Sequence, residues 1–267
     1  MRRQDPPAVP QIAVPITVPN FLCTAGAAST NTKAKAIGDL TLIAFYYLLR
    51  VGEYTRPRTV IAANGQVVRA TRTVQFTIAS VGFFSTTNQE IPKTAPLAVL
   101  LAAQYVVLRI TNQKNGRMGD LITHETILGE PVNCPGKALA RRVLHHVISN
   151  GGDKDTLLCS YLDELGTWHT LTPNDMRLAL RHAARKLNLH TQEGIDTDLI
   201  GVHSLRAGGA MAMKLNGSSD TSIKKQGRWS SLTFLQYIHN QIAHLTKDLS
   251  TKMSTPLPYV NVAHFAA

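Results

Sequence analysis

Several segments of this chain carry apolar residues at helical spacing, and they flank a middle stretch where apolar and polar residues alternate. Helical spacing gathers apolar side chains on one face of a helix, whereas alternation gathers them on one face of a strand. We expect helices at 32–50, 137–149, 173–187, 204–215 and 233–245, and strands at 74–84, 105–110 and 121–127. This order predicts an α+β fold that is mainly helical with a small antiparallel sheet.

The proline distribution indicates how the chain is organised. Residues 1–20 hold five of the thirteen prolines, a pattern typical of an extended, flexible segment. The 267 residues are enough for one large domain or two small ones. We therefore expect a proline-rich arm at 1–31, a compact domain at 32–250 and a tail at 251–267.

The charge is strongly positive. Lys and Arg number 28 against 17 Asp and Glu, which gives a formal net charge of +11. Such an excess favours a phosphate-rich partner, above all nucleic acid, and its alternative is a basic surface without a function. Only 17% of the residues are charged, so the imbalance reflects scarce acids as much as abundant bases.

Other classes of protein lack their signatures here. No apolar run reaches the roughly 18 residues of a membrane span, and no signal peptide opens the chain, so we expect a soluble, intracellular protein. The three cysteines are widely separated, which does not suit a disulfide framework. Neither a CxxC nor an HExxH motif occurs, and we expect no metal site.

Two His-x-x-Arg pairs occur, and their surroundings differ. His182 and Arg185 lie in mid-helix among other basic residues, which is typical of a solvated or phosphate-brushing face. His203 and Arg206 lie at a predicted helix start, where free N–H groups and the helix dipole favour anions. The small residues at 207–210 allow another backbone to pack closely, so the second pair predicts a phosphate site.

Four further features accompany this pair in a fixed order. Arg50 follows an apolar helix within LLRVGEYT and is followed by Glu53, and Lys114 lies in the turn-rich link between two predicted strands. Downstream, GRWSSLTFLQYIH contains Trp229 and, eight residues later, Tyr237. This series resembles the tyrosine recombinases of the phage integrase type, and its wording is most similar to eukaryotic mobile-element recombinases of the Crypton kind. The resemblance spans about residues 33–245.

The resemblance implies a tyrosine recombinase catalytic fold and a DNA-breaking chemistry. Tyr237 is the implied nucleophile, which stores the broken phosphodiester as a 3′-phosphotyrosyl ester that another strand's 5′-OH attacks. The implied enzyme is a site-specific recombinase or integrase of a mobile element that needs no metal or cofactor.

The other matched residues receive implied roles around the phosphate. Arg50 and Arg206 clamp its non-bridging oxygens, because planar guanidiniums suit the spread charge of the transition state. His203 carries a proton or contacts an oxygen, Trp229 donates its indole N–H, and Lys114 protonates the leaving 5′-oxygen.

Each residue alone has a structural interpretation. Arg50 would end a helix, where a cation is favoured, and Trp229 and Tyr237 suit a core. Lys114 suits a solvated turn, and Lys93 in another turn is an alternative general acid. The ordered set favours the active site.

The chain also departs from the family pattern. The Trp-to-Tyr gap is one residue shorter than in many members. We expect the family's usual N-terminal DNA-clamp domain to be absent or truncated, because only about thirty residues precede the region of resemblance. A type IB topoisomerase-like relaxase and an inactive DNA-binding remnant remain alternatives. The implied partner is double-stranded DNA, on which relatives form tetramers through an exchanged C-terminal segment, here 246–267. We expect no membrane and no small-molecule substrate, and a nuclear location in a eukaryote or a cytoplasmic one otherwise.

Overall fold

The computed structural model describes residues 12–56, 59–61, 66–69, 73–110, 119–127, 129, 132–231 and 234–235. The helices are α1 (Thr17–Ala28), α2 (Thr32–Tyr46), α3 (Val51–Tyr54), α4 (Leu97–Leu101), α5 (Pro135–Asn150), α6 (Pro173–Lys186), α7 (Leu189–Glu193), α8 (Ser204–Leu215) and α9 (Asp220–Gln226). The strands are β1 (Thr59–Ile61), β2 (Val67–Arg69), β3 (Val81–Phe84), β4 (Glu90–Ile91), β5 (Tyr105–Arg109), β6 (Leu121–Glu125), β7 (Ser160–Leu162) and β8 (Trp168–Thr170). Short 3-10 turns lie at Ile78–Ser80 and Thr197–Leu199.

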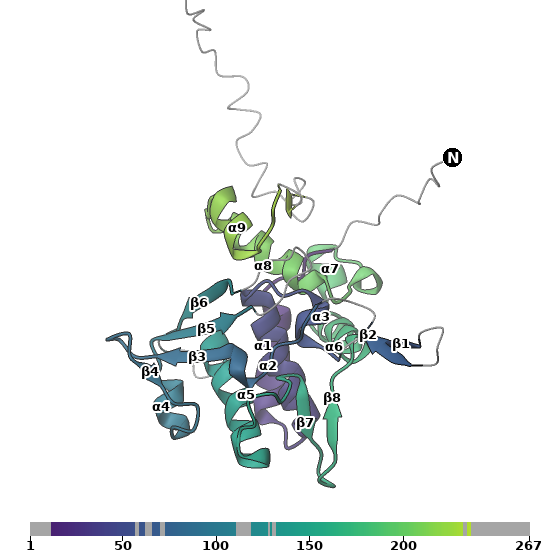
Figure 1. Cartoon of the computed structure of the whole chain (residues 1–267). Coiled ribbons are helices and arrows are strands. Elements are labelled where there is room, and N and C mark those ends of the chain that lie inside the picture. The colour runs from purple at the N-terminus through teal and green to yellow at the C-terminus, as the bar shows by residue number, and fades with distance from the viewer. Residues whose placement is uncertain are drawn as a thin grey trace, which may run out of the picture.

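Helix α2 lies at the centre of the molecule and packs against α1, α5, α6 and α8 (Figure 1). The side chain of Asn31 accepts the Ala34 N–H and begins the helix. Helix α1 approaches very closely, since a Cβ atom at Gly38 would lie 2.6 Å from the Leu22 carbonyl oxygen. Only glycine permits this approach, so the sequence fixes the α1–α2 contact.

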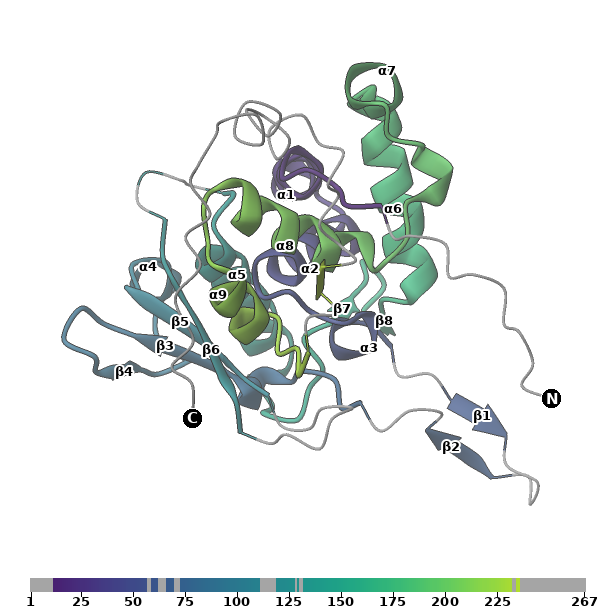
Figure 2. The same ribbon diagram turned by 90° about the horizontal axis from the view of Figure 1, so that it is seen from above.

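The main sheet is antiparallel and has the strand order β4-β3-β5-β6. Its register pairs Leu108 of β5 with Val81 on one side and with Ile122 on the other. These three side chains are buried, which gives the sheet one apolar face. The pairs β1–β2 and β7–β8 form two separate two-stranded sheets, and Figure 2 shows β1 and β2 standing away from the body of the molecule.

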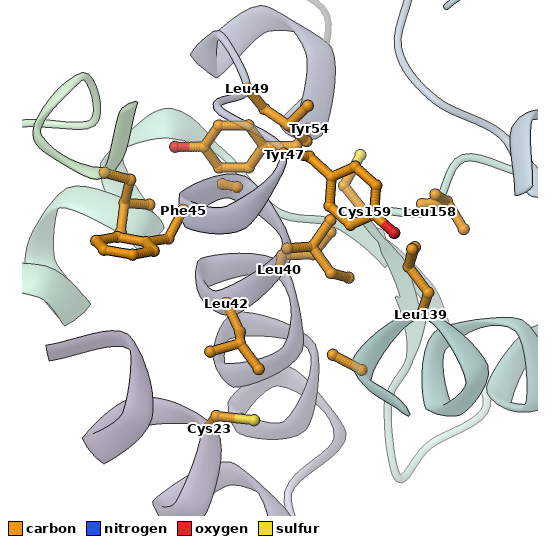
Figure 3. Close-up of a cluster of buried hydrophobic side chains, with 14 of the residues drawn as sticks. Cys23, Leu40, Leu42, Phe45, Tyr47, Leu49, Tyr54, Leu139, Leu158 and Cys159 are labelled. Atoms are coloured by element: carbon orange, nitrogen blue, oxygen red, sulfur yellow. The ribbon is translucent and has the colours of Figure 1, made fainter. Parts of the chain in front are cut away.

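The main core joins α1, α2, α5 and the sheet. Figure 3 shows Leu40, Leu42 and Phe45 of α2 with Cys23 of α1 and Leu139 of α5, and all five are buried. The Tyr47 hydroxyl donates to the Val106 carbonyl at 3.0 Å, which ties the end of α2 to the sheet. The C-terminal end of α2 is therefore packed in the core and hydrogen-bonded to the sheet.

The predicted α+β class is confirmed, and so are the helices at α5, α6 and α8. Helix α6 begins as its sequence indicates, with the Thr172 hydroxyl accepting the Asp175 N–H at 3.1 Å and Pro173 in the first turn. The helix expected at 233–245 lies outside the described residues, apart from residues 234 and 235. None of the helices in the described part of the chain is long and apolar enough to cross a membrane.

Three expectations from sequence are wrong. Residues 17–28 of the expected arm form α1, because Pro19 falls in the first helical turn, where its missing N–H costs nothing. The helix expected at 32–50 ends at Tyr46, because Leu48 adopts a left-handed conformation with φ of 47°. The alternating residues before β3 are not a continuous strand but contain the turn Ile78–Ser80.

Candidate phosphate-binding site

The turn after α2 places Arg50 at the start of α3. The Arg50 backbone N–H donates to Glu53 Oε2 at 2.8 Å, and the Glu53 N–H donates to the Arg50 carbonyl at 2.8 Å. The Arg50 guanidinium also forms an ion pair with Glu53 Oε1 at 3.3 Å. Arg50 therefore precedes a helix instead of ending one, so the dipole at a helix C-terminus does not account for it.

Helix α8 brings Arg206 to the same turn. The Arg206 side chain donates to the carbonyl oxygens of Leu48 and Gly227, and the residue is only 2% exposed. This contact requires α8 to pack directly on the end of α2. A Cβ atom at Gly209 would lie 2.3 Å from the Phe45 carbonyl oxygen, so the small residues after Arg206 allow the approach.

Trp229 covers the Arg206 guanidinium. The Arg206 Cζ atom lies 4.3 Å from the centroid of the indole ring, which is cation–π geometry. The ring also packs against Phe234, with centroids 5.4 Å apart. Trp229 and Arg206 therefore lie in contact, as expected for two residues of one site. The implied hydrogen bond from the indole N–H of Trp229 stays a prediction.

Arg228 is a member of this cluster that the sequence interpretation missed. Its Nη2 atom donates to Glu53 Oε2 at 3.1 Å and to the Leu48 carbonyl at 3.0 Å. Both side chains of the Arg228–Glu53 pair are 2% exposed. The sequence signal for Arg228 is its distance from Tyr237. Arg228 lies nine residues before Tyr237, which is the gap found in many family members, whereas Trp229 lies eight residues before it.

The cluster carries an excess of positive charge. Arg50 and Arg228 pair with the carboxylate of Glu53, and Arg206 donates to the Leu48 carbonyl beside them. The Asp120 carboxylate also acts on Arg228, so three guanidiniums face two carboxylates. Burial lowers the pKa of Arg228, and the Glu53 carboxylate opposes that shift. Such a cluster suits an anion that gains negative charge during a reaction.

His203 lies immediately before α8, one turn from Arg206. Desolvation and, to a smaller extent, the Arg206 guanidinium lower its pKa from the usual histidine value. A neutral imidazole at pH 7 can accept a proton, which agrees with the role that the resemblance implies.

A groove with a volume of about 730 Å³ runs beside the cluster, between β6 and α9. Its lining includes Asp120, Thr123, Lys224, Lys225, Arg228 and Trp229. The wall is tied together by Gln226 of α9, whose Nε2 atom lies 2.8 Å from His124 Nε2 of β6. Lys224, Lys225 and Arg228 outnumber Asp120 among its charged lining residues, so the groove leading to the arginines carries an excess of positive charge.

The structure brings Arg50, His203, Arg206 and Trp229 together, whereas Lys114 and Tyr237 lie outside the described residues. Lys93, the alternative to Lys114, lines a different cavity of about 380 Å³ on the sheet. No group of three His, Cys, Asp or Glu side chains that would hold a metal ion is found in the described part of the chain.

The other His-x-x-Arg pair is not part of this cluster. Arg185 forms an ion pair with Asp198 at 2.6 Å, and both side chains are well exposed. His182 is exposed on the same helix, α6. This face of α6 therefore forms an exposed ion pair with the turn at Thr197–Leu199, as expected for a solvated surface.

No family model matches the chain, and no curated protein matches it. Among solved structures, the crystal structure of XerA recombinase is similar, with a TM-score of 0.45, 14% identity and coverage of 95% of this chain and 68% of that one. The Tn1549 transposon integrase with circular intermediate DNA has a TM-score of 0.42 and 12% identity, covering 94% and 70%. The same integrase with transposon right end DNA has a TM-score of 0.43 and 10% identity, covering 94% and 69%. These neighbours are recombinases and integrases. They are of the kind that the sequence motifs resemble, and they carry no information on the Crypton-like detail.

Proposed function

We propose that this chain breaks and rejoins double-stranded DNA through a 3′-phosphotyrosyl intermediate, as a site-specific recombinase or integrase of a mobile element. The observation that supports this most is the meeting of Arg50 and Arg206. They are remote in sequence, yet the Leu48–Glu53 turn holds both guanidiniums, with His203 one turn away. The resemblance to tyrosine recombinases implies that the same residues contact one phosphate.

The charge of the cluster fits the proposed step. A DNA phosphodiester carries one negative charge, and a second develops on its oxygens as the nucleophile attacks. A cluster in which cations outnumber carboxylates therefore stabilises the transition state more than the ground state, which is the requirement for catalysis. Within the proposal, His203 accepts the phenolic proton of Tyr237 as its oxygen attacks phosphorus. The bond to the 5′-oxygen breaks, and Lys114 gives that oxygen a proton.

The partner in this proposal is duplex DNA, with a tetramer as the active assembly and the nucleus as its location in a eukaryotic host. The basic groove between β6 and α9 supports the DNA partner. Mass photometry with and without a duplex measures the assembly directly.

The deciding experiment uses a nicked duplex that carries the end sequence of the element. The wild-type chain is expected to form a covalent adduct that survives denaturation, and Tyr237→Phe is expected to form none. Tyr105→Phe is the matched control, because Tyr105 lies on β5 and is 37% exposed. Adduct in Y237F shows that another residue is the nucleophile. DNA binding without adduct in the wild type supports the inactive remnant, and relaxation of supercoils without strand exchange supports the topoisomerase-like enzyme.

A further inference from the structure

The Glu53 carboxylate forms ion pairs with two guanidiniums of the arginine cluster, those of Arg50 and Arg228. We propose that Arg228 is a positioning residue: it neutralises Glu53, so that the guanidinium of Arg50 stays directed to the DNA phosphate. The inference rests on the proposed function and deepens it, because it assigns a role to a residue outside the predicted catalytic set.

The two ion pairs of Glu53 are not equivalent. Arg228 and Glu53 are both 2% exposed, and their atoms lie 3.1 Å apart. Arg50 is 21% exposed and lies 3.3 Å from the other carboxylate oxygen. Water screens a desolvated pair least, so Arg228 is the main counter-ion of Glu53. Arg50 keeps the exposure that contact with a ligand requires.

Arg228 also shares an acceptor with the second clamping arginine. The Leu48 carbonyl accepts hydrogen bonds from both Arg206 and Arg228. Arg228 therefore contacts the partner of Arg50 on one side and the partner of Arg206 on the other. One side chain fixes the relative position of the two guanidiniums.

The backbone conformation of Arg228 indicates that contacts of its side chain stabilise this position. Arg228 has a φ of 59°, in the left-handed region where a side chain is strained and glycine is favoured. Its Nε and Nη1 atoms are buried and have no hydrogen-bond partner among the described residues. Both features are unfavourable for folding, so the ion pair and the shared carbonyl must offset them.

The consequence of removing Arg228 follows from the charge of Glu53. A buried carboxylate without its main counter-ion draws in the nearest remaining cation, which is Arg50. The Arg50 guanidinium is then neutralised by Glu53 and lost to the phosphate. If Glu53 is made neutral at the same time, its carboxylate no longer competes with the phosphate for Arg50.

The test is a double-mutant cycle of Arg228→Met and Glu53→Gln on the full chain, followed by single-turnover adduct formation. R228M is expected to slow adduct formation about 100-fold, the usual effect of losing one transition-state contact. The double variant E53Q/R228M is expected to recover to within about tenfold of the wild type, because positions in contact are not additive. If the double variant is as slow as R228M, Arg228 acts directly on the phosphate or only on the fold, and the inference is wrong.

A control separates this role from general loss of stability. Arg142 of α5 is also 2% exposed, and its guanidinium donates to the carbonyl oxygens of Leu158 and Ser160. Arg142→Met is expected to lower the melting temperature while the folded fraction cleaves at the wild-type rate. Arg228→Lys, which keeps the charge, is expected to cleave faster than R228M. Equal rates for R228K and R228M contradict the neutralising role.

A second readout does not depend on cleavage. The salt dependence of binding to a short duplex counts the phosphate contacts. We expect the slope to fall by about one contact in R228M and to recover in E53Q/R228M. If the wild type forms no adduct but the slopes behave in this way, the proposed function fails and the positioning role of Arg228 stands. Identical slopes in all variants refute the positioning role itself.

Discussion

The close packing of α8 on α2 gives a direct test of how the site is held. In Gly209→Ala, the new Cβ atom would lie 2.3 Å from the Phe45 carbonyl oxygen and 2.3 Å from Leu48 Cδ2. Ordinary contacts are longer by about 1 Å, so the two helices must separate by about that distance. Overpacking of this kind costs about 1–3 kcal/mol. For a chain of this size, the expected fall in melting temperature is about 2–12 °C.

The same separation of α8 from α2 should also slow the proposed cleavage reaction. The carbonyl of Leu48 positions Arg206, and a displacement of about 1 Å in a positioning group can slow a reaction up to about 100-fold. The assays are thermal unfolding and single-turnover adduct formation on the nicked duplex. Gly52→Ala is the control, because a Cβ there meets only the Thr73 side chain, at 3.6 Å. If G209A melts and cleaves like G52A, the close approach does not hold the site and the reasoning fails.

Three further predictions concern single side chains. Arg206→Ala should reduce adduct formation by at least about 100-fold while much of the salt-sensitive DNA binding remains, and an equal loss of both would show a binding contact only. Thr172→Ala should cost about 1 kcal/mol of stability by removing the cap of α6, without changing the cleavage rate of the folded chain. Burial lowers the pKa of His124 to about 4, so the unfolded chain binds a proton that the folded chain does not, and stability falls as the pH drops from 6.5 to 4. His124→Gln should flatten that decline by up to about 1.4 kcal/mol per pH unit, and an unchanged slope in denaturant titrations would contradict it.

The parts of the fold that the sequence predicts are those with strong local signals. Helix α6 has a capping threonine, a proline in its first turn and a regular apolar face, and it begins where these features indicate. Helix α9 was missed because seven residues are too few to show a period. The break after α2 was missed because Leu48 takes a left-handed conformation that neither glycine nor proline announces.

The residues of the candidate site also differ in how far the sequence predicts them. Arg50, His203 and Arg206 stand in recognisable motifs, and the sequence placed them in one site. The pairing of Glu53 with Arg228 depends on contact between segments 175 residues apart, which no local pattern encodes. Glu53 was noted only as the acidic residue that follows Arg50. In the tertiary structure its carboxylate pairs with both Arg50 and Arg228.

The long separation between the two halves of the cluster has a consequence during synthesis. The turn at Leu48 leaves the ribosome early, whereas Arg206 and Arg228 follow 158 and 180 residues later. Domains fold as units, and contacts between remote segments form late because of the entropy of closing so long a loop. A growing chain therefore exposes the Leu48 turn well before Arg206 and Arg228 are made. The arginine cluster is complete only once Arg228 has been synthesised.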